Sequence, residues 1–572
     1  MSNRTSTSRS SVSRHVRRCY TASLLLASLG VFGGCADATS EDDADDTADA
    51  VKGCNKGGSS ASYGGSCRQS PIREQPPASA ALPKVTQTPS DVAASLGAIR
   101  SVTPAVLEAA GYQQREIFIS GSANAYRFVG APGKDGRWNV EVDPGSAAPY
   151  TTRLVVFTPK DPRRFTGTVV TEWANVTAGS DALPDLIWDH STVFRNGDAY
   201  VGVSAQFVGV ASAKSIDPAR YDALSHPGDS WSYDIFSQAG MAVWRSPEVL
   251  GGLRPVAQIA VGESQSAGRM AVYIDALAPR DNVYNGYLVH SRGGSMFSLQ
   301  QASSTALVNT SGGQVMLPDG NVGRALQESP QYAGSRTDLV TPVLYVMSET
   351  DVFAPPFGAL DYGPATQENS RGFRLWEIAG TAHIDDTVVN RAAGDLGDAE
   401  AAKGAFNAML TPPQGFPGFT CDKPINTGEH GYVLSAALVQ LIRWTRTGGA
   451  PSGIPAAEPP LFAGQSAGEP TGTLPQRDKF GNILGGVRTP AVDVPVAALT
   501  GVANTPDFAC ALSGTTEPLS PETLKALYPT HDVFEAKWCD SVGRLARQGF
   551  LTFADAQNLS AAGKAAAVPS QE

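Results

Sequence analysis

The stretch that decides the fold runs Ile259-Ala-Val-Gly-Glu-Ser-Gln-Ser-Ala-Gly-Arg269. Its apolar first half is typical of a buried strand, and the residues after Arg269 repeat apolar side chains at helical spacing. Between them lies Ser264, with Gly262 and Ser266 two residues away on either side, small enough for a strand and a helix to pass close together. Such a sharp strand-to-helix turn presents a serine hydroxyl at the edge of a parallel sheet. The stretch therefore predicts a nucleophilic serine.

This turn also leaves an alternative open. Glycine is the commoner residue two positions after the serine, and Ser266 stands there instead. A Gly-x-Ser turn also occurs as an ordinary helix N-cap, in which the serine oxygen accepts backbone hydrogen bonds. Catalysis requires the rest of the chain to supply an acid and then a histidine, in that order.

Two further apolar runs supply both residues in that order. The first is followed by Glu349 and Asp351, and the second, Phe373–Ile378, is followed by His383. A carboxylate just beyond a parallel strand lies at the sheet edge where ligands bind. We expect His383 to take the serine proton and Asp351 to hold the other ring nitrogen. Glu349 is the alternative acid, and solvated acids beside a structural histidine are the other interpretation.

The negative charge that develops during attack by a serine needs two backbone N–H donors. One should come from Gln265, the residue after the serine, and the other from the loop after a strand predicted at Thr168–Trp173. In that loop we favour the N–H of Val176, with Asn175 as the second choice. Arg292 follows another apolar run and is a possible substrate contact, unless it pairs with a loop acid instead.

Several motifs carry a family resemblance. They are Val261-Gly-Glu-Ser-Gln-Ser-Ala-Gly-Arg269, Leu288-Val-His-Ser-Arg-Gly-Gly294, Ser348-Glu-Thr-Asp351, Leu375-Trp-Glu-Ile-Ala-Gly-Thr-Ala-His383 and Gly485-Gly-Val-Arg-Thr-Pro-Ala-Val-Asp-Val-Pro495. Together they resemble a bacterial group called "alpha/beta hydrolase domain" proteins, over roughly residues 115–559. The resemblance implies the α/β-hydrolase fold and a triad of Ser264, Asp351 and His383. It leaves the substrate open.

The fold prediction also rests on how the patterns alternate. Strand and helix patterns follow one another over residues 81–450, which predicts an α/β-hydrolase core with a mostly parallel sheet and helices on both faces. Residues 295–338 are rich in Ser, Gln and Gly, so we expect a lid-like insertion there. Residues 451–572 begin Pro-rich and then carry helix-start signals at Ser520 and Thr552. They predict a helical C-terminal extension packed on the core.

The N-terminus predicts export. In residues 1–34, several arginines precede a short Leu-rich apolar run, as in a signal peptide. Small residues ending at Cys35 resemble a lipoprotein cleavage site, so we expect lipidation of Cys35; cleavage nearby without lipid is the alternative. Residues 35–80, acidic and then rich in Gly and Ser, predict a disordered spacer. These features predict an envelope lipoprotein of the outer membrane or periplasm, tethered to a membrane surface, or else a secreted protein.

The cysteines fit an oxidising compartment. We favour a disulfide between Cys421 and Cys510, which leaves Cys539 as a buried thiol. Cys54 and Cys67 are near enough in sequence to close a small loop, and sequence does not establish connectivity. No zinc-site or metalloprotease spacing occurs, so no metal is expected.

Composition narrows the class of function. The chain has 572 residues, of which 42% are hydrophobic and 17% charged, with a formal net charge of −11. It can bury a large core, and its acidic balance without a basic patch argues against nucleic-acid binding. We predict an exported serine esterase that needs no cofactor and cleaves small-molecule or lipid-like carboxylic esters through an acyl-enzyme on Ser264. Acyl transfer by the same residues and a non-catalytic surface binding protein are the alternatives; the oligomeric state is open.

Overall fold

The computed structural model describes residues 80–87, 99–294, 296–300, 308–310, 314–316, 322–324, 329–447, 455 and 475–569. The predicted signal peptide, Cys35 and the predicted spacer up to residue 79 lie outside these ranges. Much of the predicted insertion 295–338 also lies outside them. The described part of that insertion includes a small antiparallel sheet of β10 (Val308–Thr310), β11 (Gln314–Met316) and β12 (Val322–Arg324).

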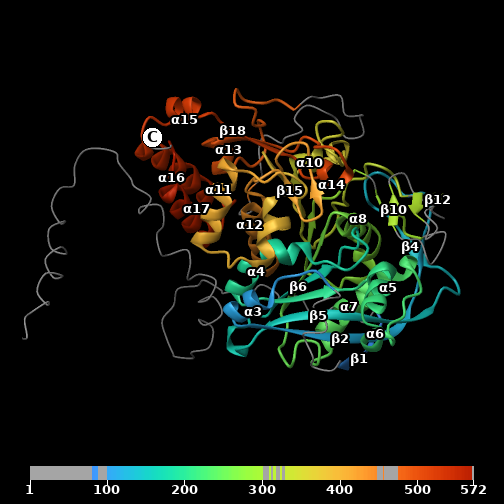
Figure 1. The fold of residues 1–572 in the computed structure, drawn as a ribbon. Coiled ribbons are helices and arrows are strands. Elements are labelled where there is room, and N and C mark those ends of the chain that lie inside the picture. The colour runs from blue at the N-terminus through green and yellow to red at the C-terminus, as the bar shows by residue number, and fades with distance from the viewer. Residues whose placement is uncertain are drawn as a thin grey trace, which may run out of the picture.

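A nine-stranded sheet occupies the centre of the molecule, in the order β1-β2-β5-β7-β6-β8-β9-β13-β14 (Figure 1). From β7 to β14 in this order the strands run parallel, and β1, β2, β5 and β7 pair antiparallel. The prediction of a mostly parallel sheet is therefore confirmed. The strands are β1 (Lys84–Gln87), β2 (Tyr112–Ala123), β5 (Ala148–Pro159), β6 (Thr168–Trp173), β7 (Ala199–Val203), β8 (Ala257–Glu263), β9 (Gly286–His290), β13 (Val343–Ser348) and β14 (Phe373–Ile378).

The central strands are buried along their whole length, which is why their sequences are almost continuously apolar. A strand covered by helices on both faces has no solvent side on which polar residues would alternate. At the other end of the sheet, β2 keeps exposed positions. A separate hairpin of β3 (Tyr126–Phe128) and β4 (Val140–Val142) follows β2.

Helices cover both faces of the sheet, as predicted (Figure 1). On one face, α4 (Pro184–Asn196) and α12 (His430–Thr447) pack against each other and on the central strands. On the other lie α7 (Ser232–Arg245) and α8 (Gln265–Val272). The remaining helices of this part are α3 (Pro104–Ala110), α5 (Phe207–Ile216), α6 (Pro218–Tyr221), α9 (Ala278–Asp281), α10 (Glu349–Val352) and α11 (Ala399–Leu410).

The C-terminal extension is largely helical and packs on the core. Figure 1 shows α16 and α17 beside α11, and α17 contacts α11 along its length. The predicted helix starts are confirmed, because the Ser520 and Thr552 side chains accept hydrogen bonds from the first turns of α15 and α17. The elements are α13 (Pro490–Asp493), β17 (Ala497–Thr500), α14 (Phe508–Ala511), β18 (Thr515–Pro518), α15 (Pro521–Leu527), α16 (His531–Gln548) and α17 (Phe553–Ala565).

One cysteine prediction is confirmed and one is wrong. Cys421 and Cys510 form a disulfide that spans 89 positions of sequence. Cys539, predicted as a buried thiol, is only partly buried and is disulfide-bonded, with its partner outside the described residues. The reason is helical geometry: Trp538 of α16 faces the core, and the next residue points about 100° away from it.

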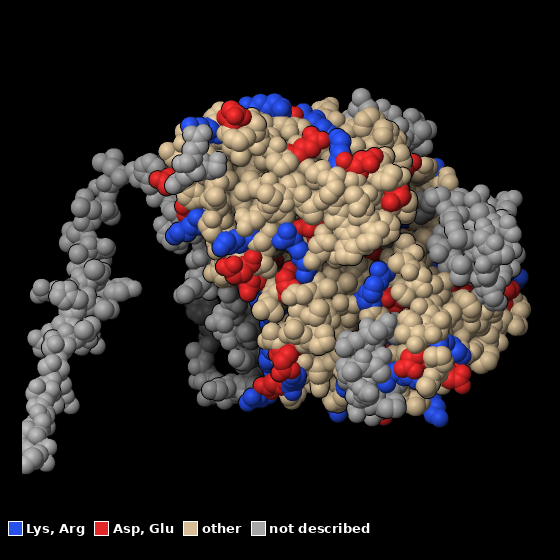
Figure 2. All heavy atoms as spheres, viewed as in Figure 1, with Lys and Arg blue, Asp and Glu red and all other residues tan. Residues whose placement is uncertain are grey.

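Among the described helices, none combines the length and the apolar character that crossing a bilayer requires. Lys and Arg side chains lie among Asp and Glu on the face shown in Figure 2 rather than in one separate patch.

Candidate active site

Ser264 sits in a strained turn between β8 and α8. Its backbone has φ 57° and ψ −117°, a conformation that is rare for a residue with a side chain and that is characteristic of functional sites. A Cβ at Gly262 would lie 2.9 Å from the carbonyl oxygen of Ser266, so this position has no room for a side chain. Ser264 is partly exposed, whereas its neighbours on both sides are buried.

Ser266 explains how the turn tolerates serine where glycine is usual. Its hydroxyl donates to the carbonyl of Glu263 at 2.8 Å and accepts from the Glu263 N–H at 3.1 Å. Both hydrogen-bonding roles of the buried hydroxyl are thereby satisfied inside the turn.

The structure brings Ser264, His383 and Asp351 together although they come from three separate segments, which follow β8, β14 and β13. Ser264 Oγ lies 2.7 Å from His383 Nε2, and His383 Nδ1 lies 2.6 Å from Asp351 Oδ1. The second oxygen of Asp351 accepts the Ser348 N–H at 2.7 Å, within the capping box that begins α10. Helix capping therefore aims the Asp351 carboxylate at the histidine.

The electrostatics match this geometry. Burial alone would raise the pKa of Asp351, but the adjacent His383 and the Ser348 N–H outweigh it and lower the pKa below its ordinary value. Burial alone would lower the pKa of His383, but Asp351 and then Glu263 outweigh it and raise that pKa. The carboxylate is therefore poised to remain charged and to stabilise an imidazolium.

The alternative acid lies elsewhere. Glu349 is fully buried and forms an ion pair with Arg477 of the C-terminal extension. Its carboxylate is committed to that arginine, and His383 hydrogen-bonds to Asp351 instead.

Two backbone N–H groups near the serine are candidates for an oxyanion hole. Among the described residues, the N–H groups of Gln265 and Val176 donate to no other atom. Gln265 is the first residue of α8, where such a free N–H is expected. The second choice, Asn175, is unsuitable because its N–H already donates to the Ala182 carbonyl at 2.9 Å.

Glu263 is a residue of this site that the sequence analysis missed. One carboxylate oxygen lies 3.5 Å from His383 Nε2, and the other accepts from the Asn175 side chain at 3.0 Å. Burial, partly offset by His383, raises the pKa of Glu263 to about 8. The available signal was its position directly before Ser264 in the turn.

The predicted substrate contact at Arg292 is wrong. Its side chain is completely buried, with the guanidinium over the rings of Tyr345 and Tyr362. It donates to the Ala333 carbonyl and lies 2.6 Å from the Met296 sulfur. Its position directly after a strand suggested that Arg292 would be accessible to substrate, but tertiary packing encloses the side chain.

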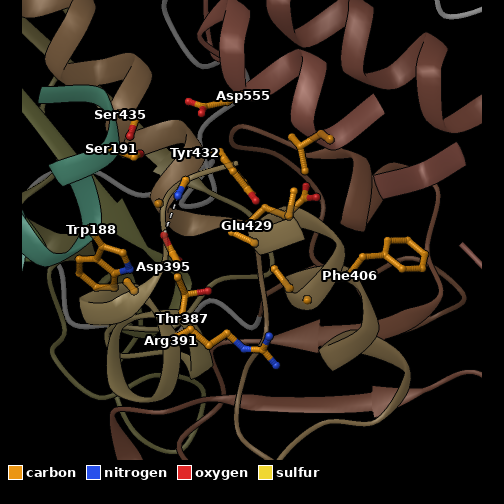
Figure 3. Close-up of a pocket in the computed structure, with 18 of the residues that line it drawn as sticks. Trp188, Ser191, Thr387, Arg391, Asp395, Phe406, Glu429, Tyr432, Ser435 and Asp555 are labelled. Carbon is orange, nitrogen blue, oxygen red and sulfur yellow. Dashed lines mark hydrogen bonds between the residues drawn. The ribbon is translucent and has the colours of Figure 1, made fainter. Parts of the chain in front are cut away.

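A cavity of about 190 Å³ lies apart from these residues, between α4, α11, α12 and α17 (Figure 3). Trp188 lies at one edge and Phe406 at the opposite edge, and none of the three predicted catalytic residues lines it. Within the described ranges, no group of three His, Cys, Asp or Glu side chains is arranged to hold a metal ion.

A model of the alpha/beta hydrolase domain family matches residues 76–561. The chain belongs to this family. No curated protein matches this alpha/beta hydrolase in sequence.

Solved structures give only remote likenesses. Esterase Est22 is 12% identical, with 43% of this chain and 66% of that chain covered at a TM-score of 0.26. A putative dienelactone hydrolase from Klebsiella pneumoniae subsp. pneumoniae is 10% identical, with 51% and 97% covered at 0.23. Methylesterase BT1017 is 12% identical, with 48% and 47% covered at 0.24. In another Est22 structure the likeness spans only 51% of that chain. Such low TM-scores carry no argument about the substrate of this alpha/beta hydrolase.

Proposed function

We propose that this alpha/beta hydrolase is a serine esterase that cleaves carboxylic esters through an acyl-enzyme on Ser264. The observation that carries the proposal is the hydrogen-bonded series from Asp351 through His383 to Ser264, at 2.6 and 2.7 Å. A serine hydroxyl is a weak nucleophile at neutral pH, and an oriented histidine is what activates it.

The proposed reaction has two halves. Ser264 Oγ attacks the ester carbonyl while His383 Nε2 takes its proton, and the N–H groups of Gln265 and Val176 bind the resulting oxyanion. The intermediate collapses, the C–O bond to the alcohol breaks, and His383 returns its proton to the departing alcohol. Water then attacks the acyl-enzyme with His383 as base, releasing the acid and restoring the serine. No cofactor is required, and the substrate is a small-molecule or lipid-like ester.

Labelling with a fluorophosphonate probe tests this proposal. We expect the wild-type protein to be labelled, Ser264→Ala to be unlabelled, and Ser435→Ala to be labelled at the wild-type rate. Ser435 is a matched control because it is buried on α12 and hydrogen-bonded to Asp189, away from the three residues. Absence of labelling in folded wild-type protein would overturn the proposal in favour of a binding protein. Adding a competing alcohol acceptor to ester assays separates hydrolysis from acyl transfer.

We also propose that the protein is exported and anchored to a membrane surface through lipid on Cys35. Support comes from the N-terminal sequence and from the Cys421–Cys510 disulfide, since such bonds persist in oxidising compartments. Metabolic labelling with an alkyne fatty acid should mark the wild-type protein and not Cys35→Ala. Equal labelling of both would contradict the lipid anchor.

A further inference from the structure

A second buried series of hydrogen bonds runs beside the three catalytic candidates. Asp185 Oδ1 lies 2.7 Å from His290 Nδ1, and His290 Nε2 lies 2.9 Å from His430 Nε2. His430 Nδ1 lies 3.0 Å from the carbonyl oxygen of Ala382. All three side chains are at most 2% exposed. None of them has a role in the proposed reaction.

This series reaches the turn that carries Ser264 and the loop that carries His383. Asp185 lies in the first turn of α4, a few residues after the loop that carries Val176. His290 ends β9, and its carbonyl accepts the Ser264 N–H at 2.9 Å. The series ends on the peptide group that joins Ala382 to His383. Its members are up to 245 positions apart and meet only in the folded chain.

The chemistry of the last acceptor gives the series a direction. A carbonyl oxygen can only accept, so His430 Nδ1 must carry hydrogen and donate to Ala382. If both histidines are neutral, His430 Nε2 then accepts from His290 Nε2–H, and His290 Nδ1 must itself accept. Its partner, Asp185, can donate only as the protonated acid. The other assignments with the same number of protons place a carboxylate opposite an imidazolium.

The surroundings favour the neutral assignment. The indole of Trp188 lies against both imidazole rings, with ring centroids 4.8 and 4.7 Å away, and Trp188 also lines the cavity in Figure 3. A carboxylate on Asp185 and an imidazolium on either histidine would be costly among these buried side chains, because burial removes their hydration. Burial raises the pKa of Asp185 to about 8 and lowers the pKa of each histidine to about 3.

We propose that Asp185, His290 and His430 are positioning residues, whose one-way series of neutral hydrogen bonds starts at the Asp185 hydroxyl and holds His383 in place through the Ala382 carbonyl. This inference rests on the proposed function, since it concerns the placement of the same general base. A misplacement of a catalytic group by about 1 Å can lower the rate by about a hundredfold. Losing the buried hydrogen bonds that support the His383 loop can therefore lower kcat strongly.

Other titratable groups face this series and bear on any pH dependence. They are Glu172 of β6, Asp189 of α4, Tyr200 of β7, Glu263 of β8, Asp351 of α10 and His383 of the loop after β14, and Asp385 of that loop faces Trp188. Of these, the protonation of His383 sets the acid limb of the rate profile, because only its neutral form can accept the serine proton.

NMR of the protein carrying nitrogen-labelled histidine tests the direction without any turnover. We expect neutral His290 with hydrogen on Nε2 and neutral His430 with hydrogen on Nδ1. A His290 that carries hydrogen on Nδ1, alone or on both nitrogens, would overturn the neutral series. The NMR measurement still reports the direction of the hydrogen bonds if the wild-type protein is not labelled by fluorophosphonate. A failure of the positioning proposal can therefore be distinguished from a failure of the proposed esterase function.

Paired variants test the positioning role on p-nitrophenyl acetate. Asp185→Asn keeps an N–H donor toward His290, so we expect kcat within about threefold of wild type, whereas Asp185→Leu should lose about tenfold or more. His430→Phe keeps the ring against Trp188 but loses the bond to Ala382, and should lower kcat by about a hundredfold with little change in KM. His430→Asn restores a donor near that carbonyl and should recover at least part of the loss.

The pH profile separates positioning from stability. His430→Phe should move the acid limb of kcat/KM to lower pH, because a loosened contact with Asp351 raises the pKa of His383 less. His190→Phe is the matched control: His190 is also buried and bonded to backbone carbonyls, but not to this loop, so it should leave the limb in place. An unmoved limb and unchanged kcat in folded His430→Phe would overturn the proposal. If His430→Phe does not fold, equal activity of Asp185→Asn and Asp185→Leu would overturn the proposal.

Discussion

Replacing Asp351 with asparagine should disable the site for a reason visible in its hydrogen bonds. The two carboxylate oxygens face two donors, His383 Nδ1–H at 2.6 Å and the Ser348 N–H at 2.7 Å. An amide has one acceptor and one donor, so it cannot satisfy both. If its NH₂ faces His383, the ring takes the other tautomer and Nε2 can no longer accept the proton of Ser264. If its NH₂ faces Ser348, a buried backbone N–H is left without a partner.

The size of the effect follows from the lost charge. A carboxylate and an imidazolium whose charges lie about 4 Å apart attract by roughly 4 kcal/mol at an effective dielectric constant of about 20. Each 1.36 kcal/mol is about tenfold in rate, so removing this attraction costs about a thousandfold in kcat/KM. The tautomer change adds to this loss.

The assay is the rate of fluorophosphonate labelling together with kcat/KM on p-nitrophenyl acetate. Glu349→Gln is the matched control, since Glu349 is a buried acid in the same turn but is paired with Arg477. We expect the control to lose stability while its labelling rate stays within about threefold, because a broken buried ion pair mainly penalises folding. Asp351→Asn with more than about a tenth of wild-type activity would refute the reasoning.

Three further predictions concern Glu263, the Cys421–Cys510 disulfide and Gly262. Burial raises the pKa of Glu263 to about 8, and the ionised carboxylate would stabilise the imidazolium of His383 3.5 Å away. We therefore expect kcat to rise through about pH 8 in wild type and to show no such step in Glu263→Gln. A step that survives in the variant would exclude Glu263 as the group that titrates. Removing the disulfide by Cys421→Ser with Cys510→Ser should lower the free energy of unfolding by about 4–5 kcal/mol, because it frees a loop spanning 89 positions, and an unchanged urea midpoint would contradict this. Gly262→Ala should cost about 1–3 kcal/mol of stability and slow labelling, because its Cβ would lie 2.9 Å from a backbone oxygen of the turn; wild-type values for both would show that the turn can shift at little cost.

Much of this molecule could be predicted from local sequence pattern. The turn at Ser264 needs small neighbours and a strand-to-helix change, and both are visible within a few residues. The order of serine, acid and histidine follows from chain topology, since parallel strands place the loops that follow them at one sheet edge. The same reasoning located the central strands and the starts of α15 and α17. The N–H groups of Val176 and Gln265, also chosen from position, donate to no atom within the described part of the chain.

What only the tertiary structure decided depends on contacts between distant parts of the chain. Position in the sequence left Glu349 open as the alternative to Asp351, and in the fold Glu349 pairs with Arg477 whereas Asp351 contacts His383. Arg292 looked accessible after its strand, but aromatic rings enclose it. His290 and His430 are 140 positions apart, and no local pattern marks them as partners. Periodicity and spacing in a sequence report which elements form and which edge they share, whereas the pairing of buried polar groups depends on how those elements pack against one another.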